Sequence, residues 1–256
     1  MDVVLRHART YTALRRACLA LSVLTLVGVP LWHAHFAGAP LLGPPGAFDV
    51  LGLQFVDPVA LAAAGRISLF VLPGIVLVAV LGRFFCAWIC PYAALLAASN
   101  ALRWWLEKLG FKPLDVKLPK PTRWLVLAAV LVFGGSQWLL FFYPPSVIGR
   151  QVFHAVYFGG LTFGAVAVLG AFAFDTFLSR AGFCRSLCPG GAMYSLAGAF
   201  SPITVRVNRD ACTDCTACDV VCNMGQSPMT GRVDEGCDRC GKCVASCPTK
   251  ALRFGR

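Results

Sequence analysis

The sequence predicts a membrane all-α four-helix bundle, built from two related helix pairs, joined to a small α+β ferredoxin-like domain with two 4Fe–4S clusters. The chain is 57% hydrophobic and only 14% charged, whereas soluble domains have roughly 25% charged residues. Long apolar runs that need a lipid environment are therefore expected. Eight of the thirteen cysteines lie within 212–247, with the spacing of an iron–sulfur protein. We expect a transmembrane domain over 1–200 and a ferredoxin-type domain over 201–256.

Four apolar segments are long enough to cross a hydrocarbon layer of about 30 Å, which takes roughly 20 helical residues. They cover about residues 17–36, 67–89, 124–143 and 152–178. Segment 47–64 is also apolar, but Gly52 and Pro58 interrupt it. We expect an interfacial or re-entrant helix there rather than a fifth span.

Lysine and arginine residues alternate between the two sides of these spans. The stretches before, between and after the spans hold 4, 1, 7, 1 and 10 of them, with Arg83 counted at the inner end of the second span. Because cytoplasmic loops carry the excess, both termini and the cysteine-rich domain are expected in the cytoplasm, with the chain in a bacterial inner membrane. The net charge of +11 does not gather in a base-reading element, so no nucleic-acid partner is expected.

The strongest chemical signal is a duplicated C-x-x-C-x-x-C-x-x-x-C run. CTDCTACDVVC begins at Cys212 and CDRCGKCVASC begins at Cys237, an offset of 25 residues. In bacterial ferredoxins the fourth cysteine of such a run ligates the other cluster, which predicts two crossed ligand sets. Cluster one takes Cys212, Cys215, Cys218 and Cys247, and cluster two takes Cys237, Cys240, Cys243 and Cys222.

Paired zinc sites are the alternative for these eight cysteines, but zinc does not require a duplicated three-plus-one pattern. Short strand-like pieces, Ile203 to Val207 and Ala251 to Phe254, flank the motifs. One departure concerns Asn223, which follows Cys222 where the usual run has proline, as at Pro248. The environment and potential of the cluster closed by Cys222 are expected to differ for that reason.

A second repeat has the pattern C-x-x-x-C-P. FFCAWICP begins at Phe84 and GFCRSLCP begins at Gly182, 98 residues apart, at the cytoplasmic ends of the second and fourth spans. Thiols at i and i+4 share one helix face, so pairs on neighbouring helices can converge. Three interpretations remain open: an additional metal or iron–sulfur centre, a thiol–disulfide or partner-docking site, and small packing residues with an inherited repeat. The four residues are Cys86, Cys90, Cys184 and Cys188.

His33, His35 and His154 fall near the outer ends of the first and fourth spans. Histidine can accept a quinol proton at physiological pH, so these residues are candidates for an outer quinol site or for b-type haem ligation. Ordinary interfacial polar residues are the alternative. Asp175, near the inner end of the fourth span, is expected to cap a helix or pair with Arg180, with proton movement as the alternative.

GRFFCAWICP, RAGFCRSLCP and the eight C-terminal cysteines resemble the NapH-type membrane iron–sulfur proteins, quinol dehydrogenase components with MauN-type and NosR-type relatives. The resemblance covers nearly the whole chain. For NapH-like proteins it implies quinol oxidation in the membrane, with electrons passed towards a periplasmic reductase. The MauN-like branch is associated with production of an active periplasmic amine dehydrogenase, and the NosR-like branch supports nitrous oxide reduction.

We therefore expect an electron-transfer subunit rather than a stand-alone enzyme, with quinol as substrate. Its expected partners are membrane lipid, the quinone pool, another ferredoxin-like subunit, and a cytochrome or periplasmic oxidoreductase. One alternative is an assembly factor that supplies electrons for maturation of a periplasmic enzyme with a metal or quinone cofactor. A plain membrane anchor is the second alternative.

Overall fold

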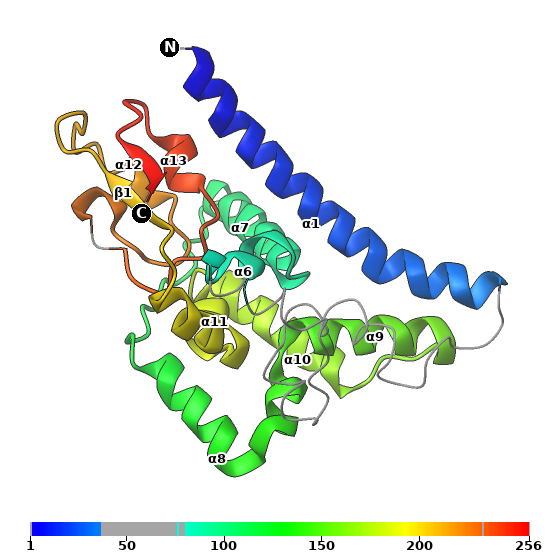
Figure 1. Ribbon diagram of the computed structural model, residues 1–256. Coiled ribbons are helices and arrows are strands. Elements are labelled where there is room, and N and C mark those ends of the chain that lie inside the picture. Colours follow the sequence, from blue (N-terminus) through cyan, green and yellow to red (C-terminus); the bar gives the residue numbers. More distant parts are fainter. Residues whose placement is uncertain (1, 37–75, 77–79, 232, 256) are drawn as a thin grey trace.

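The computed structural model describes residues 2–36, 76, 80–231 and 233–255. Within them the chain is largely helical, with one two-stranded sheet near the C-terminus (Figure 1). The elements are α1 (Asp2–Phe36), α6 (Phe84–Trp88), α7 (Tyr92–Lys108), α8 (Thr122–Phe142), α9 (Pro144–Phe158), α10 (Phe163–Ala173), the π-helical turns η2 (Phe174–Leu178) and η3 (Phe183–Leu187), α11 (Pro189–Ala199), β1 (Thr204–Val207), α12 (Ala217–Val220), the 3₁₀ turn η4 (Pro228–Thr230), α13 (Lys242–Ser246) and β2 (Leu252–Gly255). The predicted interfacial segment 47–64 and most of the predicted span 67–89 lie outside the described residues.

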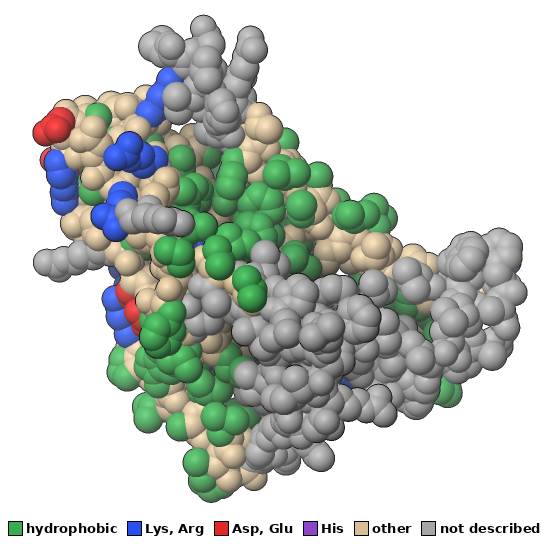
Figure 2. All heavy atoms as spheres, viewed as in Figure 1, with side chains coloured by type: hydrophobic (Ala, Val, Ile, Leu, Met, Phe, Trp, Pro, Cys, Tyr) green, Lys and Arg blue, Asp and Glu red, His purple; other side chains and the backbone are tan. Residues whose placement is uncertain are grey.

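Helix α1 contains the first predicted span and runs along one side of the molecule, from the ferredoxin-type domain to α9 (Figure 1). Its segment Thr10–Gly28 is, among the described residues, the one helical stretch long and apolar enough to cross a membrane. Thr122–Phe133 and Phe163–Leu178 are apolar but shorter. Figure 2 shows apolar side chains over much of the helical part and Lys and Arg gathered over the ferredoxin-type domain.

Helix α8 contains most of the third predicted span, but it does not run straight. At its start, Arg123 donates to Ser195 Oγ at 3.5 Å. Just after its end, the hydroxyls of Tyr143 and Tyr194 lie 3.2 Å apart. A straight helix of 21 residues would be about 31 Å long, so its ends could not both reach neighbouring residues of α11. The helix bends back on itself (Figure 1), and the Gly134–Gly135 pair within it is a sequence at which helices bend.

The fourth predicted span, 152–178, is two helices rather than one. Helix α9 ends at Phe158 and is followed by Gly159 in the left-handed conformation, with a φ of +64°. Glycine adopts this conformation without steric cost and commonly ends helices. Helix α10 then begins at Phe163.

The ferredoxin-type domain is built around the antiparallel pair β1–β2, in which Val205 lies opposite Phe254. These strands match the two predicted strand pieces to within one residue. Helices α12 and α13 begin 25 residues apart, at Ala217 and Lys242. Buried side chains of both strands and both short helices form one small core: Val205, Cys218, Cys243 and Leu252.

A separate core holds the helical part together at the first C-x-x-x-C-P motif. Its buried members come from α6, α7, α11 and the junction of α8 with α9: Phe85, Cys90, Tyr92, Tyr143 and Tyr194. The repeat is therefore held in a packed interior, directly beside the ferredoxin-type domain.

Candidate metal centres

Two cavities in the ferredoxin-type domain are each lined by four cysteines. Cage one is lined by Cys212, Cys215, Cys218 and Cys247, and cage two by Cys222, Cys237, Cys240 and Cys243. The fourth cysteine of each run lies in the cage of the other run, which is the crossed arrangement that the spacing predicts. All eight are free thiols, so the donor set fits two iron–sulfur clusters.

The two halves of this domain repeat in backbone conformation as well as in sequence. Three pairs of residues 25 positions apart all have positive φ: Asp214 and Arg239, Thr216 and Gly241, and Gly225 and Lys250. Residues other than glycine rarely adopt this conformation. Its recurrence at equivalent positions means that both loops wrap their cages in the same way.

Burial makes the thiol form of several cage cysteines favourable in the absence of metal. It raises the pKa of Cys237 to about 12, with the nearby Asp238 charge adding to the rise. It also raises the pKa of Cys243 to about 12, with Cys237 contributing. For Cys247, burial acts in the same direction, but hydrogen bonds from Thr249 and from backbone N–H groups outweigh it and lower the pKa. Because the thiolate is the ligand, metal binding at these cages must release protons.

A mononuclear metal fits these sites poorly. In the described part of the chain, no three His, Cys, Asp or Glu side chains converge closely enough to share one metal ion. Zinc would require four thiolates at about 2.3 Å from a single centre. Thiols spread around a cavity suit a polynuclear cluster instead.

The two C-x-x-x-C-P motifs meet at a third cavity, of about 260 Å³, which we call the thiol cavity. All four motif cysteines line it: Cys86, Cys90, Cys184 and Cys188. The motifs share a backbone turn, because Cys90 N–H donates to Phe85 O at 3.0 Å and Cys188 N–H donates to Phe183 O at 2.8 Å. The sequence repeat is thus also a structural repeat, and it gathers four thiols at one place.

The second cysteine of each motif lies within two residues of the start of a helix. Cys90 and Pro91 lead into α7, and Cys188 leads into α11, whose first residue is Pro189. Gly191 N–H donates to Cys188 Sγ at 3.3 Å. Burial and the neighbouring Cys86 together raise the pKa of Cys188 to about 12, although hydrogen bonds from the N–H groups of Gly191 and Gly190 act in the opposite direction. Free N–H groups at a helix N-terminus favour negative charge, so the site suits anionic sulfur once a metal replaces the thiol proton.

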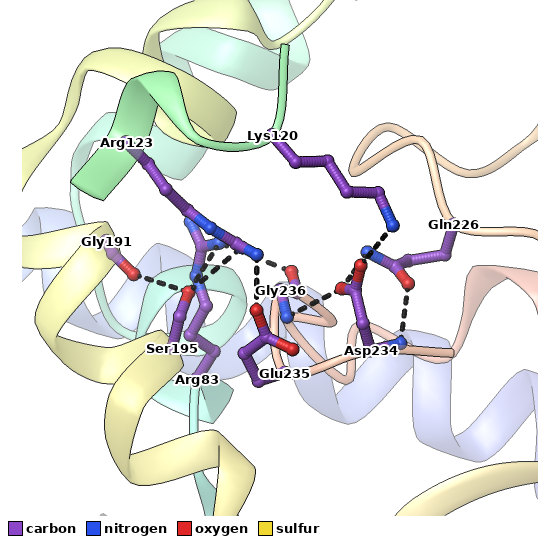
Figure 3. A network of polar contacts seen from close by, with 9 residues as sticks. All are labelled: Arg83, Lys120, Arg123, Gly191, Ser195, Gln226, Asp234, Glu235 and Gly236. Carbon is purple, nitrogen blue, oxygen red and sulfur yellow. Dashed lines mark hydrogen bonds and ion pairs between the residues drawn. The ribbon is translucent and has the colours of Figure 1, made fainter. Parts of the chain in front are cut away.

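Arg83 lines the thiol cavity and contacts Ser195 and Gly236, the residue before the cage-two run (Figure 3). Its side chain is almost fully buried, with 1% exposed. It donates to Cys184 O at 2.7 Å, to Gly236 O at 3.2 Å and to Ser195 Oγ at 3.3 Å. From the sequence, Arg83 was counted only as one of the basic residues that indicate membrane orientation, and no local pattern distinguishes it from other arginines.

Two further basic residues hold the segment that precedes cage two (Figure 3). Arg123 forms an ion pair with Glu235. Lys120 Nζ lies 2.6 Å from Asp234 Oδ2, and Gln226 Nε2 donates to Asp234 Oδ1 at 2.6 Å. The helical part and the ferredoxin-type domain are thereby joined by polar contacts around a common edge.

Cage two and the thiol cavity share a wall. Asp238, Cys240 and Lys242 line both. The residues that line cage one include none of those that line the thiol cavity. Cage two is therefore the ferredoxin cage next to the C-x-x-x-C-P thiols.

The described candidate histidines are not part of this arrangement. Of the two whose side chains the structure describes, neither His35 nor His154 lines the thiol cavity or either cage. His154 lies in α9 with its ring 5.3 Å from the ring of Phe158. His35 lies near the C-terminal end of α1, and the side chain of His33 lies outside the described ones.

Of its two expected roles, Asp175 does not pair with Arg180 but does bond the first residue of a helical turn, η3. It accepts a hydrogen bond from the Tyr92 hydroxyl at 2.9 Å and another from Phe183 N–H at 2.8 Å. Arg180 Nε instead donates to Asn100 Oδ1 at 3.2 Å. The buried carboxylate thus ties η2 to both C-x-x-x-C-P regions, because Tyr92 follows the first motif and Phe183 begins the turn of the second.

Comparison with known proteins gives consistent results. A family described as "4Fe-4S binding domain" matches residues 62–109 and 161–207, so each match contains one C-x-x-x-C-P motif, and a second family with the same description matches 232–253. The chain is 31% identical to the ferredoxin-type protein NapH of Haemophilus influenzae, over 89% of this chain and 81% of the relative. It is 33% identical to the methylamine utilization ferredoxin-type protein MauN of Paracoccus denitrificans, over 84% and 76% respectively. No solved structure matches significantly.

Proposed function

We propose that this chain, which belongs to the family of ferredoxin-type NapH and MauN proteins, is an iron–sulfur electron-transfer protein that carries electrons between the quinone pool and a periplasmic redox system. The observation that supports this most directly is the set of three cysteine-lined cavities: the thiol cavity, cage two, which shares a wall with it, and cage one in the same ferredoxin-type domain. Bound 4Fe–4S clusters supply one-electron transfer, and substrate chemistry would take place on a partner protein.

In this proposal the eight C-terminal cysteines act only as ligands. Cys212, Cys215, Cys218 and Cys247 hold the cluster in cage one, and Cys222, Cys237, Cys240 and Cys243 hold the cluster in cage two. Reduction by a quinol analogue is the direct test. Anaerobically purified protein in lipid nanodiscs should lose its visible cluster absorbance and develop the electron paramagnetic resonance signal of reduced clusters. Clusters that accept electrons from dithionite but stay oxidised with quinol, at matched potential and with partners supplied, would remove the quinone pool from the proposal.

We further propose that Cys86, Cys90, Cys184 and Cys188 hold an additional iron–sulfur centre. Three observations support it: four free thiols around one cavity, a helix start behind the second cysteine of each motif, and the buried Arg83 cation beside them. A positive charge and helix N-termini offset the negative charge of a thiolate-bound centre.

Iron and sulfide analysis tests this centre. Wild-type protein should contain more than the roughly eight iron atoms that two cubane clusters supply. Replacing Cys90 and Cys188 with Ser should return the count to about eight, whereas Cys18→Ser, at the one cysteine outside both repeats, should leave it unchanged. A wild-type count of about eight would show that the additional centre is absent while leaving cages one and two intact.

The proposed location is a bacterial inner membrane, with both termini cytoplasmic. The apolar stretch Thr10–Gly28 supports membrane association, and the lysine and arginine distribution supports the orientation. Green fluorescent protein at the C-terminus should fluoresce. Alkaline phosphatase fused after Arg150 should be active if segment 124–143 crosses the membrane and inactive if α8 returns to the cytoplasmic side.

A role in assembly is the second candidate, because MauN proteins are among the relatives. Deleting the gene distinguishes the two roles. An electron carrier leaves its periplasmic partner enzyme fully assembled but without electrons. An assembly factor leaves that enzyme without its cofactor, which mass spectrometry and absorption spectroscopy of the purified partner would reveal.

A further inference from the structure

The thiol cavity is much larger than the cages that hold clusters. Cages one and two measure about 20 Å³ each, and the thiol cavity measures about 260 Å³. Even with a metal centre at its four cysteines, the thiol cavity has room for a second occupant.

The walls indicate an occupant with a polar head and an apolar tail. Leu19 of α1 lines the cavity together with Leu96 of α7 and Met224. Further along α1, Leu24 and Leu31 are exposed, by 68% and 50%. The cavity therefore adjoins the apolar surface of the helix that is long enough to cross a membrane. A lipid-soluble molecule could place its tail along α1 and its head in the cavity.

Three residues that line the cavity each carry a buried polar atom without a hydrogen-bond partner among the described residues: Asn223 Oδ1, Arg15 Nε and Arg83 Nε. Asn223 is 8% exposed, and a buried carbonyl oxygen without a donor is destabilising. An occupant with a hydroxyl would supply the missing donor, and its other oxygen would accept from a guanidinium. A phosphodiester headgroup offers acceptors only, so it would leave Asn223 Oδ1 unpaired.

The position of Asn223 connects this site to the redox chain. It directly follows Cys222, a cage-two cysteine, at the place where the second run has Pro248. Cys240 lines both cage two and the thiol cavity. The departure from the ferredoxin pattern thus puts an amide, which can both donate and accept, beside a cluster ligand.

We infer that the thiol cavity binds the headgroup of a quinol on the cytoplasmic side, with the Asn223 amide bonded to one of its hydroxyl oxygens and Arg15 on the same wall. This inference rests on the proposed electron-transfer function and replaces the outer histidines as the quinol site. Oxidation breaks two O–H bonds and forms two C=O bonds. A cluster held by Cys222, Cys237, Cys240 and Cys243 would accept the two electrons one at a time across the wall that Cys240 lines, and the two protons would leave to water. Cage one, whose Cys215 is exposed, would then be the place where electrons leave to a partner protein.

Two substitutions at Asn223 test the site. Asn223→Leu removes the amide at similar size, and Asn223→Pro restores the usual ferredoxin residue. Both should raise the apparent KM for duroquinol about tenfold, the effect of one lost hydrogen bond, with unchanged iron content and unchanged dithionite-reduced spectra. The matched control is Asn208→Leu, at an exposed amide of the same domain. An unchanged KM in both Asn223 variants would overturn the inference and leave the electron-transfer function standing.

Photolabelling of the full-length holoprotein with an azidoquinone provides a readout other than activity. Labelled peptides should map to the segments around Leu19, Leu96 and Asn223, and Asn223→Leu should weaken the labelling. Labels confined to the peptides of His35 and His154 would overturn the inference. So would labelling that vesicles of phosphatidylglycerol abolish and vesicles of phosphatidylcholine do not, because the cavity would then be a site for an anionic lipid headgroup.

Discussion

The contacts of Arg83 lead to a quantitative prediction about how the helical part and the ferredoxin-type domain are joined. Replacing Arg83 with Met removes the donors to Cys184 O and Gly236 O, each worth about 1.5 kcal/mol for a charged donor. Ser195 Oγ keeps Arg123 as a donor, so its loss counts little. The energy needed to bury a guanidinium is relieved at the same time. The expected net loss in the free energy of unfolding is about 2 kcal/mol, or roughly 4–8 °C in Tm for a chain of this size.

The control lies in the same network. Lys120 also bridges to the segment before cage two, but its side chain is 76% exposed, and such exposed pairs contribute about 0–1 kcal/mol. Thermal melts of Arg83→Met, Arg83→Lys and Lys120→Met in detergent, followed by circular dichroism and by cluster absorbance, should rank the variants. Arg83→Lys keeps the charge but not the three-way geometry, so it should fall between the other two. Equal Tm values for Arg83→Met and Lys120→Met would refute the reasoning.

Two other predictions concern close packing around the motifs. A Cβ on Gly241 would come within 2.2 Å of the Tyr11 ring, so Gly241→Ala should destabilise the protein by about 1–3 kcal/mol. The φ of +72° at Gly241 adds backbone strain for alanine, although Thr216 at the equivalent position of the first run has a φ of +58°. The steric part of the loss should vanish in a Tyr11→Ala background, and equal losses in both backgrounds would contradict the steric explanation. Tyr92→Phe removes the hydroxyl that donates to Asp175 and should lower the free energy of unfolding by about 1–2 kcal/mol, measured by thermal melts, whereas an unchanged Tm would mean that the bond contributes nothing.

Some of this architecture could be predicted because it depends on neighbours in the chain. A cluster needs three thiolates on one short loop, so the spacing from Cys212 to Cys218 already implies a cage, and the 25-residue repeat implies a second one. The same holds for the two short strands, which the structure places within one residue of the prediction. The pairing of the C-x-x-x-C-P motifs was also visible as a repeat, although three chemical interpretations remained open.

Helix continuity was harder to predict from apolar length. The segment 152–178 is apolar throughout most of its length, but the glycines at 159 and 160 allow the chain to leave the helix there. Helix α8 is bent so that both of its ends contact α11. Apolar runs indicate where a helix can be buried, but packing partners and local glycine pairs decide whether it continues straight.

By itself, the sequence predicted the cysteine ligand sets and determined the family and the apolar character of the helical part, since these depend on residue type and short spacing. Only the tertiary structure decided where Arg83 and Asn223 lie and what surrounds them. Arg83 contacts residues that are 101, 112 and 153 positions away in the chain. Asn223 lines the thiol cavity together with residues of α1, α6 and α7. Such roles arise from which surfaces meet after folding, and one-dimensional spacing carries no record of them.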